Sequence, residues 1–224
     1  AACFEQSGTT PLAQTKTRTP AAQQDPLAVL IPLLDGLLPP GNQPGGIALA
    51  LPGWVDQENL RVGSAVNLPG WEHIPLGAAL QSHFGCPVRL ENDARLACLG
   101  EARFGAGRGC RDLIYLTIGT GIGAGVLSQG ALLRGSRGMG SEAGHILLDP
   151  RGPLCGCGQR GHLEALASGP AIARDAWQRL QTGQPSSLSP DREPAAIEVG
   201  MAALAGDALA LAAFAQAGEW IGAA

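Results

Sequence analysis

The chain has 224 residues, which is enough to bury a sizeable core in one large domain or in two lobes. Its formal net charge is -4 and its few basic residues are scattered, which excludes the electrostatic footprint of a nucleic-acid-binding or membrane-binding protein. The six cysteines lack the spacing of a disulfide framework and the chain does not open with a signal-peptide pattern, so we expect a reduced, cytoplasmic protein.

The first half of the chain predicts strands that alternate with helices. In chain order we expect a hairpin turning at Ser7-Gly8, a helix opening at Asp25-Pro26, a buried strand in "GGIALALPG", a helix in "PLGAALQSHFG" with Leu76, Leu80 and Phe84 on one face, and a short strand in "CPVRLEN". This alternation is typical of a layered α/β lobe, which we place at residues 1–110.

A second lobe is expected at residues 111–224. Its opening stretch, "DLIYLTIGTGIGAGVLSQGALLRG", predicts a buried strand, a glycine-rich turn and a second strand that turns at Gln129-Gly130, which together form an antiparallel ribbon. The stretch "HLEALASGPAIARDAWQRL" then predicts a helix broken at Gly169-Pro170, followed by a loop rich in Pro and Ser. One closing amphipathic helix is predicted by apolar residues that recur at steps of three and four: Ile197, Met201, Leu204, Ala208, Leu211 and Ala215. Its apolar stretch is too short and too interrupted to span a membrane.

The turn "GTGIGAG" suits a loop in which phosphate oxygens approach backbone N–H groups closely. It is not a dinucleotide fingerprint, because Ala124 stands where the third glycine belongs and a strand rather than a helix follows. It is not a standard P-loop either, because Lys16 is the only lysine and lies elsewhere. The alternative is a hairpin whose glycines only permit tight packing.

A strand runs into a helix at "VRLENDARLACLGEARFGAG", which places Asn92 and Asp93 at the carboxyl end of the strand. Ligands of α/β folds bind at such ends. A carboxylate there can take the proton from an alcohol that attacks a phosphoryl group. The alternative is that Asp93 only caps the helix.

His145, Cys155, Cys157 and His162 have the spacing H-x9-C-x-C-x4-H, and the glycines between them let a short chain wrap around one ion. Zinc binds nitrogen and sulfur ligands in a tetrahedron, and four such ligands form a closed structural site. A disulfide between Cys155 and Cys157 would close a strained, very small ring, and a redox pair would more usually read C-x-x-C. The alternative to zinc is a glycine-rich turn with incidental cysteines.

Taken in order, the motifs "LENDARLACLGEARFGAG", "YLTIGTGIGAGV", "GSEAGH" and "CGCGQRGHLE" resemble the ROK family of bacterial sugar kinases and repressors, most closely its glucokinase-like members; "ALPGWVD" and "NLPGW" resemble the family's sugar-side loops. The resemblance implies an actin-like ATPase (ribonuclease H-like) fold of class α/β, with a sugar and Mg-ATP cleft between two α/β lobes. It implies transfer of the γ-phosphate of ATP to a hexose, with glucose first and N-acetylmannosamine, N-acetylglucosamine or fructose as alternatives. A sugar-responsive transcriptional repressor of the same family is the rival function.

The resemblance also assigns roles to single residues that would bind the sugar. Asp93 matches the catalytic base, which also contacts the sugar, and Asn92 matches a ligand of a sugar hydroxyl. Glu142 and Glu164 match carboxylates that accept hydrogen bonds from the sugar. His145 matches a histidine that binds zinc through one ring nitrogen and faces the sugar with the other, which is consistent because metal ligation fixes the orientation of the ring.

For the cofactors, the resemblance implies that Cys155 and Cys157 bind zinc and that the backbone amides of a second phosphate loop face ATP; this loop consists of Gly119, Thr120, Gly121 and Gly123. The sequence departs from the family at His162, which stands where the family has its third zinc cysteine and would remove one negative charge from the site. The family's opening D-x-G-G-T strand and its adenosine-binding segment lack counterparts here, so we expect a kinase truncated at both ends, with weak or no turnover. A homodimer is expected from the resemblance.

Overall fold

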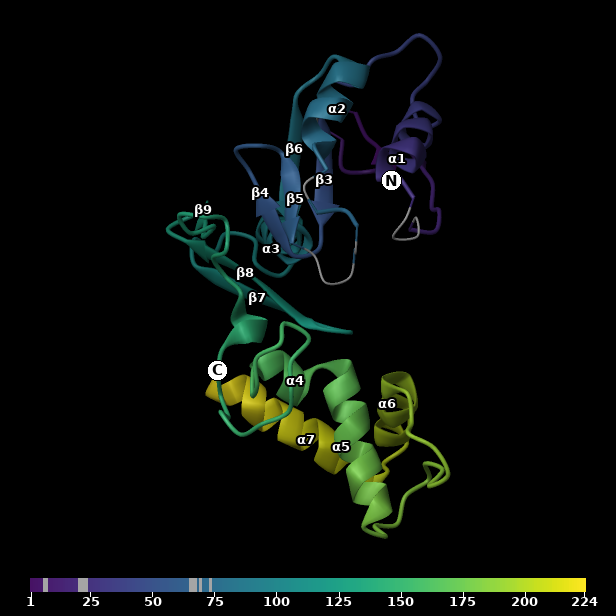
Figure 1. Cartoon of the computed structure of the whole chain (residues 1–224), viewed down its shortest axis with the longest axis vertical. Coiled ribbons are helices and arrows are strands. Elements are labelled where there is room, and N and C mark those ends of the chain that lie inside the picture. Colours follow the sequence, from purple (N-terminus) through teal and green to yellow (C-terminus); the bar gives the residue numbers. More distant parts are fainter. Residues whose placement is uncertain (6–7, 20–23, 65–67, 69, 73) are drawn as a thin grey trace. The chain divides into compact units, whose positions relative to one another are not determined.

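A computed structural model describes residues 1–5, 8–19, 24–64, 68, 70–72 and 74–224 (Figure 1). The chain forms two compact units: unit 1 comprises Ala1–Leu96 and Arg134–Met139, and unit 2 comprises Ala97–Leu133 and Gly140–Ala224. The first division between the two units falls between Leu96 and Ala97, inside a helix. The lobes expected at residues 1–110 and 111–224 remain a prediction. The hairpin turn expected at Ser7 and part of the loop "NLPGW" lie outside the described residues.

The elements of unit 1, in chain order, are β1 (Ala2–Cys3), β2 (Ala13–Gln14), α1 (Pro26–Asp35), β3 (Ile47–Leu51), β4 (Trp54–Asp56), β5 (Arg61–Ser64), α2 (Leu76–Phe84) and β6 (Val88–Asn92). The antiparallel pairing of β1 with β2 agrees with the expected hairpin. The predicted helix α1 begins where Asp25 accepts a hydrogen bond from the Leu27 N–H at 2.9 Å.

A parallel pair of strands, β3 and β6, lies at the centre of unit 1 (Figure 1). Their register pairs Leu51 with Asn92, so both strands end at the same edge. Helix α2 covers the pair with Leu76, Leu80 and Phe84, the residues predicted to share one face, and all three are buried. The helix ends at Gly85, whose φ of 64° is left-handed. This packing fixes the strand end from which helix α3 (Asp93–Phe104) starts.

The elements of unit 2, after the second part of α3, are β7 (Leu113–Ile118), β8 (Ile122–Ser128), β9 (Ala131–Leu132), the 3₁₀ turn η1 (Ala143–His145), α4 (Leu163–Ala167), α5 (Gly169–Gln181), α6 (Ala196–Leu204) and α7 (Ala208–Ala223). The antiparallel order β7-β8-β9 confirms the predicted ribbon. Its second turn has a positive φ at both Gln129 and Gly130, as a two-residue hairpin requires. A break between α4 and α5 occurs as predicted, but at Ser168 rather than at Gly169-Pro170, which begin α5.

The prediction that the first strand of the ribbon is buried was wrong. On β7, Ile114, Leu116 and Ile118 are 69%, 36% and 45% exposed, whereas Leu113 and Tyr115 between them are half-buried. Antiparallel sheets often leave one face open to solvent. The sequence hid this asymmetry because β7 carries apolar side chains on both faces.

The single closing helix predicted from the apolar periodicity was also wrong. The chain forms α6 and α7 instead, with a bend of 112° between them. The break is local: Gly206 has a φ of 87°, and the Asp207 carboxylate accepts a hydrogen bond from the Ala210 N–H at 3.0 Å, which starts α7. As a result, Ile197 and Met201, expected on the inner face, are 72% and 61% exposed.

Within the described part of the chain, no single helix is both long and apolar enough to cross a membrane, although α6 and α7 together pass that test as a bent pair on length and composition.

The Asp207 carboxylate also accepts hydrogen bonds from Ser186 Oγ and from the backbone N–H and Oγ of Ser187. Burial opposes its ionisation, but these donors and the Ala210 N–H outweigh burial and hold the pKa of Asp207 well below its usual range. We therefore expect Asp207→Ala to lower the free energy of unfolding by about 1–2 kcal/mol at pH 7, as measured by urea denaturation.

This difference should shrink at acid pH. Because the pKa is lower in the folded state, the carboxylate's contribution is complete above the unfolded pKa near 3.8 and is lost as the pH falls through the folded value. Asp191→Ala, in the loop between α5 and α6 that also carries Ser186 and Ser187, is the matched control and should change the free energy of unfolding by less than about 0.5 kcal/mol. An equal loss in the two variants would refute a specific role for Asp207.

Candidate functional site

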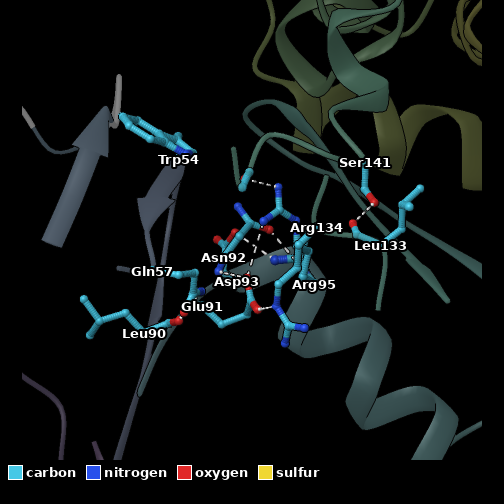
Figure 2. Close-up of polar contacts among 12 residues, drawn as sticks. Trp54, Gln57, Leu90, Glu91, Asn92, Asp93, Arg95, Leu133, Arg134 and Ser141 are labelled. Carbon is cyan, nitrogen blue, oxygen red and sulfur yellow. Dashed lines mark hydrogen bonds and ion pairs between the residues drawn. The ribbon is translucent and has the colours of Figure 1, made fainter. Parts of the chain in front are cut away.

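Asn92, the last residue of β6, is 8% exposed and makes two hydrogen bonds with its side chain (Figure 2). Its Nδ2 donates to the Gly53 carbonyl oxygen at 3.1 Å, and its Oδ1 accepts from the Arg95 N–H at 3.1 Å. The second bond spans three residues, which is the bond of a helix N-cap. Asn92 therefore caps α3, the role that the sequence left open for Asp93.

Asp93 is the first residue of α3 and is exposed to solvent. Its Oδ1 accepts a hydrogen bond from the Ala94 N–H at 2.8 Å. The side chain stands at the edge where β3 and β6 both end. An exposed carboxylate held at this edge can meet a ligand and can accept a proton from one of its hydroxyl groups.

The glycine turn of unit 2 connects β7 to β8. Gly119 and Thr120 are exposed at its tip, and the Gly119 N–H donates to the Gly121 carbonyl at 2.9 Å. A side chain on Gly119 would meet nothing within 4 Å, whereas a Cβ on Gly121 would lie 2.3 Å from Glu164 Oε2. Tight packing thus explains Gly121, but it does not explain Gly119. Gly123 lies further along β8, paired with Thr117.

Glu164 connects this turn to the cysteine loop. From helix α4, its Oε2 accepts a hydrogen bond from the Ile122 N–H at 3.0 Å, and its Oε1 accepts one from Cys155 Sγ at 3.5 Å. The carboxylate is half-buried. The turn predicted to bind phosphate and the loop predicted to bind zinc therefore share one carboxylate.

The four predicted metal ligands come together in unit 2. The ligand atoms of His145, Cys155, Cys157 and His162 all lie within 4.8 Å of one another. Cys155 Sγ is 3.8 Å from His145 Nδ1, and Cys157 Sγ is 3.2 Å from His162 Nδ1. Sulfur and nitrogen ligands of a tetrahedral zinc ion lie roughly 3.5 Å apart. The side chains present, His162 included, therefore fit a zinc ion.

Backbone hydrogen bonds shape the loop that carries these ligands. The Cys155 N–H donates to the Gln159 carbonyl at 2.7 Å, and the Leu163 N–H donates to the Ile146 carbonyl at 2.9 Å. Gly158 and Gly161 have φ values of 90° and 69°, a conformation that side chains rarely adopt. Burial, together with the neighbouring Cys157 and Glu164 side chains, raises the pKa of the Cys155 thiol to about 11, so a metal ion must displace its proton on binding.

Gly161 is the most constrained position of the loop. A Cβ there would lie 1.4 Å from the Asp149 carbonyl oxygen, and the left-handed φ adds strain. We expect Gly161→Ala to lower the free energy of unfolding by about 1–3 kcal/mol and to weaken zinc binding, as measured by urea denaturation and metal titration. Gly156→Ala, where a Cβ meets nothing within 4 Å, is the control. Equal stability of the two variants would contradict this packing.

Glu142 and His145 are held by a single 3₁₀ turn. Glu142 directly precedes η1, and its carbonyl accepts a hydrogen bond from the His145 N–H at 3.0 Å. The preceding Ser141 has a φ of 66°, and its Oγ donates to the Leu133 carbonyl oxygen at 3.0 Å (Figure 2). The turn therefore sets the spacing between a carboxylate and a candidate zinc ligand.

The structure brings the predicted residues together in two groups. Asn92 and Asp93 are adjacent in unit 1, whereas the glycine turn, Glu164 and the four candidate metal ligands are linked in unit 2. An ionic cluster beside Asp93, which the sequence did not indicate, consists of the buried Glu91 and Arg95 and the exposed Arg134. The spacing of Glu91 and Arg95 by four residues was the one signal available; Arg134 is distant in sequence.

Known proteins similar to this chain identify its family. The family model described as "ROK family" matches residues 1–224. The chain is 47% identical to a glucokinase from Thermotoga maritima over 134 residues, covering 60% of this chain and 42% of that protein. It is 40% identical to the DNA-binding transcriptional repressor Mlc from Escherichia coli over 168 residues, covering 73% of this chain and 40% of the repressor. The chain spans about half the length of the curated glucokinases it matches.

Among solved structures, a ROK family glucokinase from Streptomyces griseus in complex with glucose and AMPPNP superposes with a TM-score of 0.79 at 33% identity, covering 99% of this chain and 72% of that chain. The likeness confirms the expected α/β fold of the actin-like ATPase class. Because the family match runs through all of the residues and the fold agrees, the chain belongs to the ROK family.

Proposed function

We propose that this chain belongs to an ATP-dependent hexose kinase, with glucose as the first substrate and glucose 6-phosphate as the product. The observation that carries the proposal is the exposed Asp93 carboxylate at the shared end of β3 and β6, in a chain that matches the ROK family throughout. The likeness to glucokinases, one of them in complex with glucose and AMPPNP, supports both substrates.

In the proposed reaction, a sugar hydroxyl attacks the γ-phosphorus of Mg-ATP. The new oxygen–phosphorus bond forms, the bond to the β-phosphate oxygen breaks, and ADP leaves. Asp93 accepts the hydroxyl proton, which makes the oxygen a better nucleophile as the bond forms. The Mg²⁺ ion enters with ATP as part of the substrate.

Four further residues are proposed to hold the sugar: Asn92, Glu142, His145 and Glu164. Beyond its bonds to Gly53 and Arg95, the Asn92 amide retains one hydrogen and one lone pair. Glu142 and His145 share one short turn, which supports their acting on neighbouring hydroxyls. Glu164 already accepts two hydrogen bonds, and a carboxylate has further lone pairs for a sugar.

The phosphate loop is proposed at Gly119, Thr120, Gly121 and Gly123. The open space at Gly119 supports this role, because backbone N–H groups can approach phosphate oxygens where no side chain intervenes.

Zinc is proposed at His145, Cys155, Cys157 and His162. When bound, a closed site of four protein ligands supplies structural stability rather than a reactive water. Through His145, it would fix the orientation of a ring proposed to face the sugar. A homodimer remains a prediction from the family resemblance.

Two alternatives stay open. The similarity to the repressor Mlc favours a sugar-responsive regulator, in which the same residues would bind a sugar without phosphoryl transfer. The other alternative is a kinase for N-acetylmannosamine, N-acetylglucosamine or fructose.

One substrate screen separates these functions. The protein, expressed at full gene length, would be mixed with ATP and each of the four sugars, and ADP release would be followed with calorimetry of sugar binding in parallel. We expect ADP release to be fastest with glucose. Sugar binding without ADP release would support the regulator and refute the kinase, and faster turnover of another sugar would reassign the substrate.

A further inference from the structure

Glu91 is a buried acid directly before Asn92 and Asp93. Its side chain, on β6, is 6% exposed. Glu91 Oε1 accepts a hydrogen bond from the Asn92 N–H at 3.0 Å and faces Arg95 Nη1 at 3.4 Å, and Glu91 Oε2 accepts a hydrogen bond from Arg134 Nε at 2.6 Å (Figure 2). One buried carboxylate is therefore surrounded by two guanidinium groups and a backbone donor.

Arg95 extends this cluster to a segment distant in sequence. It lies in the first turn of α3, is 1% exposed, and donates from Nη2 to the Gly138 carbonyl oxygen at 2.7 Å. A buried charge is tolerated only when it is paired and hydrogen-bonded. Glu91 and the Gly138 carbonyl supply that compensation.

The segment Arg134–Met139 belongs to unit 1, although the residues on both sides of it belong to unit 2. Three contacts hold it there: Arg134 to Glu91, Arg95 to the Gly138 carbonyl, and Trp54 Nε1 to the Arg137 carbonyl oxygen at 2.6 Å. Gly138 has a φ of 73°, and a Cβ there would lie 3.0 Å from the Val55 carbonyl oxygen. The backbone of the segment thus fits closely against β4.

These contacts form a continuous ring of hydrogen bonds around the end of β6. Asn92 Nδ2 donates to the Gly53 carbonyl, and the next residue, Trp54, donates to the Arg137 carbonyl of the segment. The Gly138 carbonyl of the segment accepts from Arg95, and Arg95 faces Glu91, which accepts from the Asn92 N–H. Arg134 adds a second link between the segment and Glu91. Asn92 is therefore held through both its side chain and its backbone N–H, and Asp93 follows it directly at the start of α3.

We propose that Glu91, Arg95 and Arg134 are positioning residues, which fix Asn92 and Asp93 for phosphoryl transfer by holding the segment Arg134–Met139 against the strand end. The inference rests on the proposed kinase function. When a catalytic base is displaced by about 1 Å, the rate can fall roughly 100-fold. The rate gained from rigid positioning can therefore offset the cost of burying the charges of Glu91 and Arg95.

A substitution at Arg134, the partly exposed member of the cluster, can distinguish a positioning role from a role in stability. Arg134 is 47% exposed in its side chain, and the buried Glu91 keeps Arg95 and the Asn92 N–H as partners when Arg134 is replaced. Its loss should leave the fold intact, yet Glu91 would lose the donor on Oε2. Arg134→Gln is therefore the decisive variant, and Glu91→Gln tests the buried partner.

The experiment measures kcat and KM for glucose and ATP, together with the thermal midpoint, in the full-gene-length protein. We expect Arg134→Gln to lower kcat by about 10- to 100-fold with little change in the midpoint and in KM for ATP. Arg134→Lys, which keeps a charged donor for Glu91, should recover most of the rate. Arg179→Gln, which breaks the ion pair with Asp175 on α5, is the matched control and should keep the wild-type kcat.

A folded Arg134→Gln variant with wild-type kcat would overturn the inference, as would an Arg134→Lys variant that loses as much rate as Arg134→Gln. Should Glu91→Gln fail to fold, the Arg134 pair decides alone. Wild-type protein that transfers phosphate to none of the four sugars would instead defeat the proposed function, and the inference would fall with it.

Discussion

Asp93→Asn is expected to lower kcat for glucose phosphorylation by about 10²- to 10⁴-fold while the protein stays folded. The amide keeps the size of the side chain and can still accept the hydrogen bond from the Ala94 N–H, but it cannot take the proton of the attacking hydroxyl. Helix α3 should not suffer, because its capping bond comes from Asn92. Initial-rate kinetics and circular dichroism measure the two effects.

Asp175→Asn provides the control for this substitution, because it makes the same chemical change on α5, at an acid paired with Arg179. It should keep the wild-type kcat. Wild-type kcat in a folded Asp93→Asn variant would show that another group accepts the proton, and equal losses in both variants would point to a general effect of removing an acid.

Removal of zinc is the second change with a large expected effect. Free zinc at a thousandfold excess over its dissociation constant would stabilise the folded protein by about 4 kcal/mol. We expect the purified protein to hold one zinc ion per chain, and we expect chelation or Cys155→Ser to remove both the metal and this stabilisation. Elemental analysis and urea denaturation, each with and without added zinc, measure the outcome.

Substitutions at His162 test the departure from the family pattern. Cys157 Sγ lies 3.2 Å from His162 Nδ1, so the imidazole is placed to complete the tetrahedron. His162→Ala should lower the zinc content, whereas His162→Cys should retain it. Cys110→Ser, at an exposed cysteine outside the cluster, is the control. Unchanged zinc content in His162→Ala would exclude His162 as a ligand.

Local signals predicted the elements well. Asp25 before Pro26 and Gly85 after Phe84 mark the ends of α1 and α2 in both sequence and structure, because caps and left-handed glycines act within one turn. The prediction of a single closing helix was wrong because such local signals also occur within the predicted helix. The apolar steps of three and four continue from Leu204 to Ala208, although Gly206 and Asp207 between them end α6 and start α7.

The candidate site was predictable where its chemistry is close in sequence. The four metal ligands lie within one short stretch, and the structure brings their ligand atoms together. Contacts between distant segments could not be predicted: Glu164 bonds Ile122 across 42 residues, and Arg134 bonds Glu91 across 43. Such pairs depend on tertiary packing, for which a single sequence carries no periodic or spacing signal.

Phosphoryl transfer itself tests the central claim most directly. Full-gene-length protein, loaded with zinc, would be incubated with glucose and ATP labelled in the γ-phosphate, and labelled glucose 6-phosphate would be separated and counted. We predict label in glucose 6-phosphate with the wild type and at least about 100-fold less with Asp93→Asn. Glucose binding without any labelled sugar phosphate would contradict the assignment as a hexose kinase.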